Sequence, residues 1–401
     1  MCENAAVCSM LSGWIYAKAK EDISFEAFVA ATQHLESLNS FLLPMTLSFF
    51  QLANDMKNEL CTYAILSSED SVYLVFRGSS TVMDFVVDVS LAPEKIGNYW
   101  ITSGHYAALK TVLDTIIEKL SKFSSKKLFV TGHSLGGALA QLFGLLAGEE
   151  AGKERISVDF FEEVKVYSFA SPLIRWAELE EAEIDFFNQN KEDNNVARVA
   201  KVPATDRFPV PETMHGRLPA EQKLHYIVNF VYDRDVVPRY PFAAKFQLTV
   251  KNMLTYAEKK IPPIPLFNLF KGAAADIIAK AVPSIVVGYL PLGRTFLFGR
   301  TYNRLIGQDE NTVIPAKDNT WFTYEFDKCN KTKVTWKAGI VDNTIKEIKR
   351  GEKKEDHDGW IVEDHEIGKG YARLFKERAL LQSLADNLRD GVEEVATEMD
   401  N

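Results

Sequence analysis

The sequence predicts an α/β fold with a mostly parallel central sheet flanked by helices. One observation is the alternation of helical and strand-like apolar segments between residues 110 and 169. A second is a Gly-x-Ser-x-Gly motif at residues 132–136, placed between one of these strands and the helix that follows it. Strands that alternate with helices pair in parallel, because a parallel connection needs a long crossover.

The composition is that of an ordinary globular protein of 401 residues, with 46% hydrophobic and 25% charged residues. This length allows one elaborated domain. The formal net charge of -9 argues against sequence-independent binding of nucleic acid, which requires a positive face. It also disfavours electrostatic docking on anionic membranes. Any contact with lipid would therefore depend on apolar surface.

The cysteines and the N-terminus indicate a reduced, intracellular protein. The four cysteines form no CxxC pair and no Cys/His cluster with zinc spacing, so we expect neither a redox motif nor a metal site. The first residues lack the basic start of a signal peptide, and the sequence contains no apolar run long enough to span a bilayer. We expect a cytoplasmic location, with peripheral contact to a membrane or lipid droplet left open. The sequence does not indicate an oligomeric state.

The individual elements follow from the spacing of apolar residues. Helical spacing from Ile23 to about Phe50 predicts a helical N-terminal extension over residues 1–60, packed on the core. Two β-rich runs come next, separated by a Ser-Ser-Glu-Asp hairpin signal. The predicted strands are residues 60–66, 72–76, 128–131, 164–169 and 225–231, and the predicted helices are residues 110–120 and 135–149.

The main domain is predicted to cover residues 61–375, with insertions at about 175–224 and 245–287. The insertions are rich in Glu, Asn and Pro and interrupt the alternation of strands and helices. Apolar residues of the second one, such as Ile277, Ile278 and Val282, either pack on the core or face a lipid surface. Residues 376–401 are predicted to form an acidic C-terminal helix or tail.

Ser134 is the candidate nucleophile. In the segment Gly132-His133-Ser134-Leu135-Gly136, a strand runs directly into a helix, which is the setting of a nucleophile elbow. Glycines allow the tight turn that exposes the serine oxygen above the sheet. The amide of Leu135, at the positive end of its helix, is a natural donor to a transition-state oxyanion. We expect His133 to be a packing residue of the turn.

A serine hydroxyl needs a base and an acid that orients the base. Asp235 follows a predicted strand and precedes a Pro-containing turn, so it lies where a site in an open α/β sheet is expected, with Asp233 as the close alternative. In the order nucleophile, acid, base, only His357 and His365 can follow. His357 lies in a charged stretch, whereas His365 is next to apolar sequence and a helix, so we favour His365 and leave His357 open.

These motifs resemble the class 3 lipase family, which includes fungal triacylglycerol lipases and plant intracellular lipases. The segment Val75-Phe76-Arg77-Gly78-Ser79-Ser80 is similar to the oxyanion loop of the family, and Asp364-His365 with Tyr371 is similar to its histidine segment. The resemblance implies an α/β-hydrolase fold, Ser79 as a second oxyanion donor, and an apolar lid over residues 81–89 that includes Val82, Met83, Phe85 and Val86. The spacing from His365 to Tyr371 is slightly long for the family.

The resemblance implies a lipolytic serine esterase that hydrolyses acylglycerols through an acyl-enzyme on Ser134. No metal or organic cofactor is required, and the expected partner is a lipid ester substrate. Cleavage of phospholipids at the A1 position and hydrolysis of water-soluble esters remain open as alternative activities. A non-catalytic lipase-like scaffold is the alternative of another class, because fold alone does not prove chemistry.

Overall fold

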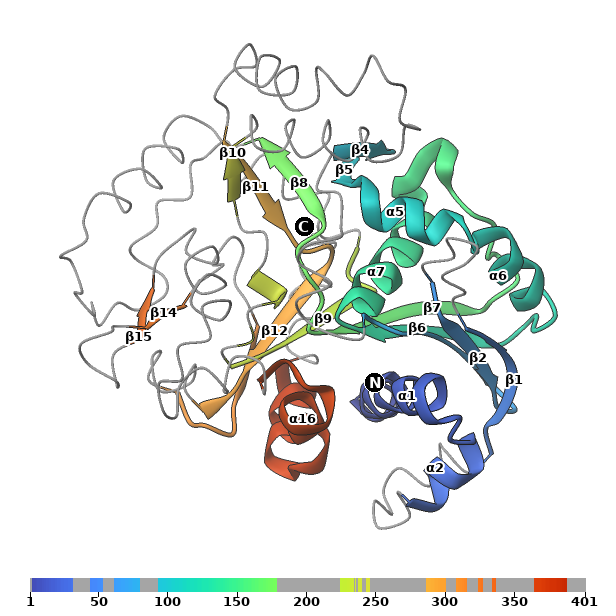
Figure 1. Ribbon diagram of the computed structural model, residues 1–401, viewed down its shortest axis with the longest axis horizontal. Helices are drawn as coiled ribbons and strands as arrows, with labels where there is room; N and C mark the ends of the chain where they lie inside the picture. Colours follow the sequence, from blue (N-terminus) through green and yellow to red (C-terminus); the bar gives the residue numbers. More distant parts are fainter. Residues whose placement is uncertain are drawn as a thin grey trace, which may run out of the picture.

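A mixed eight-stranded sheet forms the centre of the protein (Figure 1). The computed structural model describes residues 2–31, 44–52, 61–79, 93–178, 224–233, 235, 237–239, 243–245, 286–300, 308–315, 324–326, 334–336 and 364–387. The strand order is β1-β2-β3-β6-β7-β9-β12-β13. The bounds are β1 Thr46–Gln51, β2 Tyr63–Ser67, β3 Ser71–Phe76, β6 Lys127–His133, β7 Glu163–Phe169, β9 Ile227–Tyr232, β12 Arg294–Phe298 and β13 Val313–Pro315.

The strands β3, β6, β7, β9 and β12 pair in parallel, and antiparallel pairs occur only toward the two edges of this sheet. The predicted mostly parallel sheet is therefore confirmed. The carboxyl ends of parallel strands lie at the same edge, so residues that follow β6 and β9 are brought to one side of the molecule.

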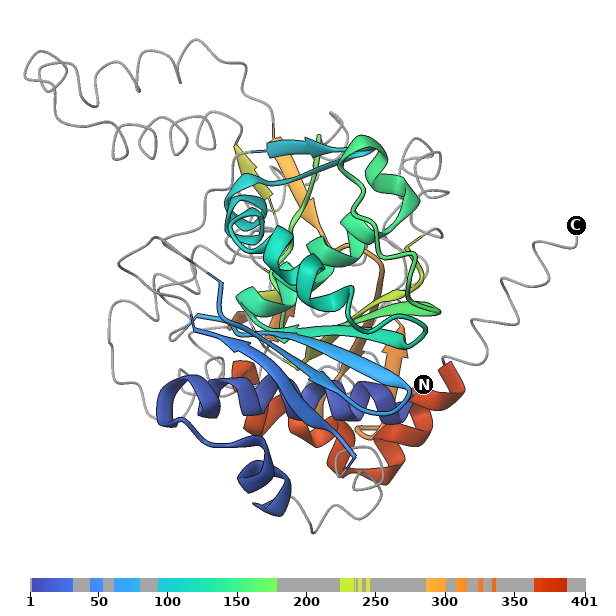
Figure 2. The same cartoon turned by 90° about the vertical axis from the view of Figure 1, so that its right-hand side faces the viewer.

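Helices cover both faces of this sheet, as Figure 2 shows. On one face lie α5, α6 and α7, followed by the short helix η2; on the other face lie α1, α2, the π-helical turn η5, α16 and a helical segment at residues 378–387. Their bounds are α1 Cys2–Glu21, α2 Phe25–Ala31, α5 Ser103–Lys110, α6 Leu113–Leu120, α7 Leu135–Ala147, η2 Glu149–Glu154, η5 Ile367–Tyr371 and α16 Ala372–Lys376. This arrangement confirms the expected α/β class, a mostly parallel central sheet flanked by helices.

Successive strand residues enter two separate cores, one on each face of the sheet. In β3, Leu74 and Phe76 pack under α7, whereas Tyr73 and Val75 pack against the layer that contains α1. Because both faces are covered, strands such as β3 are buried along their whole length and have a continuous apolar sequence. The helix α1 is itself enclosed, with buried residues on several sides, which include Ala5, Val7, Leu11, Trp14 and Ile15.

A second, antiparallel sheet has the order β10-β11-β8-β5-β4. Its strands are β4 Pro93–Ile96, β5 Tyr99–Thr102, β8 Arg175–Glu178, β10 Ala243–Lys245 and β11 Val286–Leu290. The strand β8 begins the first predicted insertion, and β10 and β11 flank the second, so the ends of both insertions are tied to one sheet. The interiors of the insertions lie outside the described residues. A short hairpin, β14 Tyr324–Phe326 with β15 Val334–Trp336, and the 3-10 turn η3 Val237–Arg239 complete the elements.

Several details differ from the sequence prediction. The helical pattern drawn to about Phe50 is wrong at residues 46–51, which form β1 and pair with β2 across a register shift between Leu47 and Phe49. The helix predicted at 110–120 begins only at Leu113, as α6, and a separate helix, α5, ends at Lys110, because Val112 between them has the non-helical angles φ -123° and ψ -6°. The strands β12 and β13 of the central sheet and all strands of the second sheet were not predicted. Among the described residues, no helix has the length and apolar character needed to cross a membrane.

Candidate active site

Ser134 lies in the turn between β6 and α7, and its backbone is strained. Its φ is 57° and its ψ is -127°, a conformation that residues with a side chain rarely adopt. Two interactions hold it there: the Ser134 amide donates to the Phe169 carbonyl over 2.9 Å, and the Ser134 carbonyl accepts from the Gly137 amide over 2.9 Å. The first bond joins the turn to β7, and the second begins the helix, which is the geometry expected of a nucleophile elbow.

Two glycines of the motif are required by close contacts across the turn. A Cβ atom at Gly132 would lie 2.3 Å from the carbonyl carbon of Gly136. A Cβ atom at Gly136 would lie 2.3 Å from the Phe76 carbonyl oxygen, at the end of β3. Both contacts are with backbone, which cannot move aside cheaply. The glycines therefore let α7 begin directly against the sheet.

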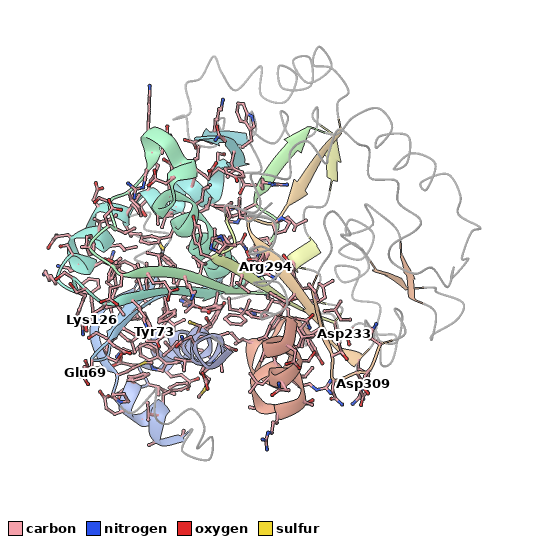
Figure 3. The ribbon with its side chains drawn as sticks, turned by 180° about the vertical axis from the view of Figure 1, so that it is seen from behind. Glu69, Tyr73, Lys126, Asp233, Arg294 and Asp309 are labelled. Carbon is pink, nitrogen blue, oxygen red and sulfur yellow. The ribbon has the colours of Figure 1, made fainter. Side chains whose placement is uncertain are left out.

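Asp235 lies just beyond the carboxyl end of β9 and is fully buried. Figure 3 labels Asp233, at the end of β9, and Arg294, at the beginning of the neighbouring β12, at opposite ends of this strand pair. The Asp235 amide donates to the Tyr232 carbonyl over 3.0 Å, and its Oδ1 accepts from the Val237 amide over 2.9 Å. These bonds fold the turn around the carboxylate and fix its direction.

His365 is brought to Asp235 from the C-terminal part of the chain. Its Nδ1 lies 2.9 Å from Oδ1 and 3.0 Å from Oδ2 of Asp235. Because an ionised carboxylate only accepts, Nδ1 carries the proton in this pair, and Nε2 is the nitrogen left for proton transfer. The alternative acid, Asp233, donates its amide to the Phe298 carbonyl over 2.8 Å and so belongs to the contact between β9 and β12. The other candidate base, His357, lies outside the described residues.

The long spacing between His365 and Tyr371 is absorbed by the π-helical turn η5. The Tyr371 hydroxyl donates to Asp235 Oδ2 over 2.5 Å and accepts from the Tyr232 amide over 3.2 Å. A π-turn carries one more residue per turn than an α-helix, so the tyrosine still reaches the acid. Gly370 permits the close packing, because a Cβ there would lie 2.6 Å from the Asp364 carbonyl oxygen. Among the described residues, Asp235 thus accepts hydrogen bonds from at least three: Val237, His365 and Tyr371.

The oxyanion candidates lie on either side of the nucleophile. Leu135 is the first residue of α7 and directly follows Ser134. Ser79, which is half-buried, follows Gly78, and a Cβ atom at Gly78 would lie 3.0 Å from the Cβ of Ser134. The loop after β3 therefore runs against the elbow. The four lid residues predicted from the resemblance, Val82, Met83, Phe85 and Val86, lie outside the described residues.

His133, which the sequence predicts to be a packing residue of the turn, is buried and also makes hydrogen bonds that the sequence did not indicate. Its Nε2 lies 2.6 Å from the His365 carbonyl oxygen, and its Nδ1 lies 3.1 Å from the hydroxyl of Tyr16 on α1. Burial, and then the adjacent His365, lower the pKa of His133 well below its ordinary value. The only sequence signal was the position next to the nucleophile, and nothing in the sequence indicated Tyr16.

The three predicted residues occupy one side of the sheet, all of them buried: Ser134 is 3%, Asp235 0% and His365 4% exposed. Asp235 and His365 are hydrogen-bonded, whereas the described residues contain no hydrogen bond between the Ser134 hydroxyl and His365. Such bonds are often long in the absence of substrate. Within the described parts of the chain, no group of three or more His, Cys, Asp or Glu side chains is placed to hold a metal ion.

Comparison with known proteins gives a match to the family Lipase (class 3) over residues 73–245. A lipase of Rhizomucor miehei is 34% identical over 85 residues, which are 20% of this chain and 23% of that lipase. The chain thus aligns with about a quarter of this curated relative.

Solved structures of similar shape include the triacylglyceride lipase of Rhizomucor miehei, at 14% identity and a TM-score of 0.38, with 73% of this chain and 78% of that chain covered. A mutant of MDLA from Penicillium cyclopium has 14% identity and a TM-score of 0.40, with 84% and 85% covered. The family match includes the loop after β3, the elbow and the acid segment. Residues 73–245 of this chain are therefore similar to the class 3 lipase family.

Proposed function

We propose that this protein is a lipolytic serine esterase that hydrolyses the carboxylic ester bonds of acylglycerols. The observation that carries the proposal is the buried hydrogen bond between His365 and Asp235, on the same side of the sheet as the strained Ser134 elbow. The family match over residues 73–245 supports the same chemistry. A buried acid with its base is expensive to maintain unless it has partners and a use.

In the proposed reaction, the Ser134 hydroxyl attacks the ester carbonyl, and His365 Nε2 takes its proton. The resulting oxyanion is held by the amides of Ser79 and Leu135. Asp235 keeps the imidazole in the required tautomer and stabilises the imidazolium. The proton then passes to the leaving alcohol, and water, activated by the same histidine, releases the fatty acid from the acyl-enzyme.

The first test is covalent labelling of the full chain with a fluorophosphonate probe. Wild-type protein should be labelled, and Ser134→Ala should not be. Ser12→Ala is a matched control, because Ser12 is also buried, but it lies on α1, where its hydroxyl is hydrogen-bonded to the hydroxyl of Thr131. Two results would contradict the proposal. One is labelling of the Ser134→Ala variant; the other is the absence of labelling of the folded wild type both with and without detergent, which would favour a non-catalytic scaffold.

The substrate is tested on the same preparation. Release of fatty acid from emulsified triacylglycerol should exceed release from phospholipid vesicles and from a short-chain ester in solution. Faster release from phospholipid or from the soluble ester would make that compound class the preferred substrate, and the proposed serine mechanism would be unaffected. His365→Ala should abolish turnover and His357→Ala should not, and the opposite result would move the base to His357.

A further inference from the structure

A hydrogen-bonded chain connects the N-terminal helix to the segment that carries the proposed base. The Tyr16 hydroxyl, on α1, lies 3.1 Å from Nδ1 of His133, and Nε2 of His133 lies 2.6 Å from the carbonyl oxygen of His365. The three residues come from distant parts of the sequence. The His133 and His365 rings are also packed together, with centroids 4.6 Å apart.

The direction of each hydrogen bond follows from the chemistry of the partners. A carbonyl oxygen only accepts, so His133 carries its proton on Nε2 and donates to His365. Burial keeps the ring neutral by lowering the pKa of His133. Nδ1 is then an acceptor, and the Tyr16 hydroxyl donates to it. Burial also raises the pKa of Tyr16, so the phenol keeps the proton that this bond requires.

Tyr16 also contacts the loop that carries the oxyanion candidate Ser79. A Cβ atom at Gly78 would lie 2.2 Å from the Tyr16 hydroxyl and 2.5 Å from the His133 carbonyl oxygen. The Arg77 guanidinium lies over the Tyr16 ring, with its Cζ 5.7 Å from the ring centroid. One side chain of α1 therefore touches both the loop after β3 and the histidine beside the nucleophile.

We propose that Tyr16 and His133 are positioning residues for the base His365. Asp235 holds the ring of His365 through Nδ1, and His133 holds its backbone carbonyl, so the base is fixed at two points. The neutral charge of His133 matters as well, because a positive ring this close would oppose formation of the His365 imidazolium. This inference rests on the proposed function and adds that α1 is part of the catalytic geometry.

Three variants of the full chain test the inference. Tyr16→Phe keeps the ring but removes the hydroxyl, and His133→Leu removes the donor. His133→Gln supplies an amide N–H in place of Nε2–H. With a soluble ester, kcat should fall about ten- to a hundredfold in the first two variants, because small misplacements of a base are costly. KM should change less than about twofold, and His133→Gln should recover most of kcat.

Two matched controls remove similar groups elsewhere. Tyr226→Phe deletes a hydroxyl that donates to the Gly144 carbonyl over 3.1 Å. His105→Gln replaces another buried histidine, whose Nδ1 lies 2.6 Å from the Thr102 hydroxyl. Both should keep kcat within about twofold of wild type. The rate of fluorophosphonate labelling should fall in proportion to kcat in Tyr16→Phe, since labelling uses the same serine and base.

The outcomes separate this inference from the proposed function. Labelled, active wild type together with folded Tyr16→Phe and His133→Leu variants of unchanged kcat would overturn the positioning roles alone. Equal losses in the two controls would also overturn them. Tyr16→Phe retains the ring packed edge-on against His133, at a centroid distance of 5.8 Å, so it decides the question even where His133→Leu does not fold. A wild type without labelling or turnover would overturn both proposals.

Discussion

At the scale of single residues, the site is built from conformations and contacts that cost stability. Ser134 has a positive φ, and Asp233, two residues before the candidate acid, also has one. Asp235 is a fully buried carboxylate, and it is tolerable because backbone and side-chain donors surround it. Strain and buried charge in one place are typical of functional sites.

Relief of the backbone strain at Ser134 should be measurable as an increase in the free energy of unfolding. Ser134→Gly and Ser134→Ala should both be inactive, but the glycine variant should unfold at higher urea concentration than the alanine variant. The expected difference is about 1 kcal/mol, since relief of backbone strain outweighs the greater entropy of glycine in the unfolded chain. An alanine variant as stable as the glycine variant would mean that this backbone carries no strain.

Substitutions of the two aspartates after β9 should differ sharply in their effect on kcat. Asp235→Asn should lower kcat about ten-thousandfold, because an amide in that position favours the wrong tautomer of the histidine. Asp233→Asn is the matched change and should lower kcat less than about tenfold. Steady-state kinetics with a soluble ester measure both. Equal losses, or a larger loss in Asp233→Asn, would reassign the acid.

At the scale of elements, the site depends on how closely α7 approaches the sheet and on the π-helical turn η5. Gly136 of α7 lies against the backbone at the end of β3, where a side chain has no room. In η5, the wider turn allows Tyr371 to reach Asp235 despite the long spacing after His365. Both devices place a side chain by adjusting backbone, which is why small residues occur in each.

Gly136→Ala should therefore be strongly destabilising. The added Cβ would lie 2.3 Å from the Phe76 carbonyl oxygen, so α7 must shift, at a cost of about 2 kcal/mol or more. Gly13→Ala, within α1, is the matched control, because a Cβ atom there would lie 3.7 Å from Ile367 Cγ2, an ordinary contact distance, and alanine favours helix. Urea unfolding compares the two. Similar stabilities would show that α7 can move away from β3 freely.

At the scale of the whole molecule, burial on both faces of the sheet encloses imidazoles that stay neutral. His105 is 1% exposed, and burial lowers its pKa to about 3. The ring ionises at an ordinary pKa of about 6.5 in the unfolded chain. Below that pH the unfolded state binds a proton that the folded state does not. This group therefore lowers the free energy of unfolding progressively as the pH is lowered from about 6.5 to about 3.

The pH dependence of unfolding should reflect His105. Between pH 7 and pH 5, this residue should reduce the free energy of unfolding by about 2 kcal/mol. His105→Gln should lose less stability than wild type over the same interval, measured by urea unfolding at each pH. The same dependence in both proteins would show that His105 is protonated in the folded state.

The sequence was sufficient for the class of fold and for the residues of the elbow, because both depend on local patterns. Short β-rich apolar runs, the strand-helix alternation and the glycines of residues 132–136 are all local features of the sequence. The prediction from sequence was wrong at residues 46–51, where an apolar segment of a few residues is compatible with either a helix or an edge strand. Pairing with β2 decides between them, and pairing is a contact between segments.

By itself, then, the sequence determined the parallel sheet, the turn at Ser134 and the short lists of candidate acids and bases. Only the tertiary structure decided that Asp235 rather than Asp233 hydrogen-bonds to His365, that η5 corrects the spacing to Tyr371, and that α1 reaches His133 through Tyr16. The physical reason is range: propensity and turn chemistry act between neighbours, whereas hydrogen bonds between buried side chains depend on how the sheet brings distant segments together.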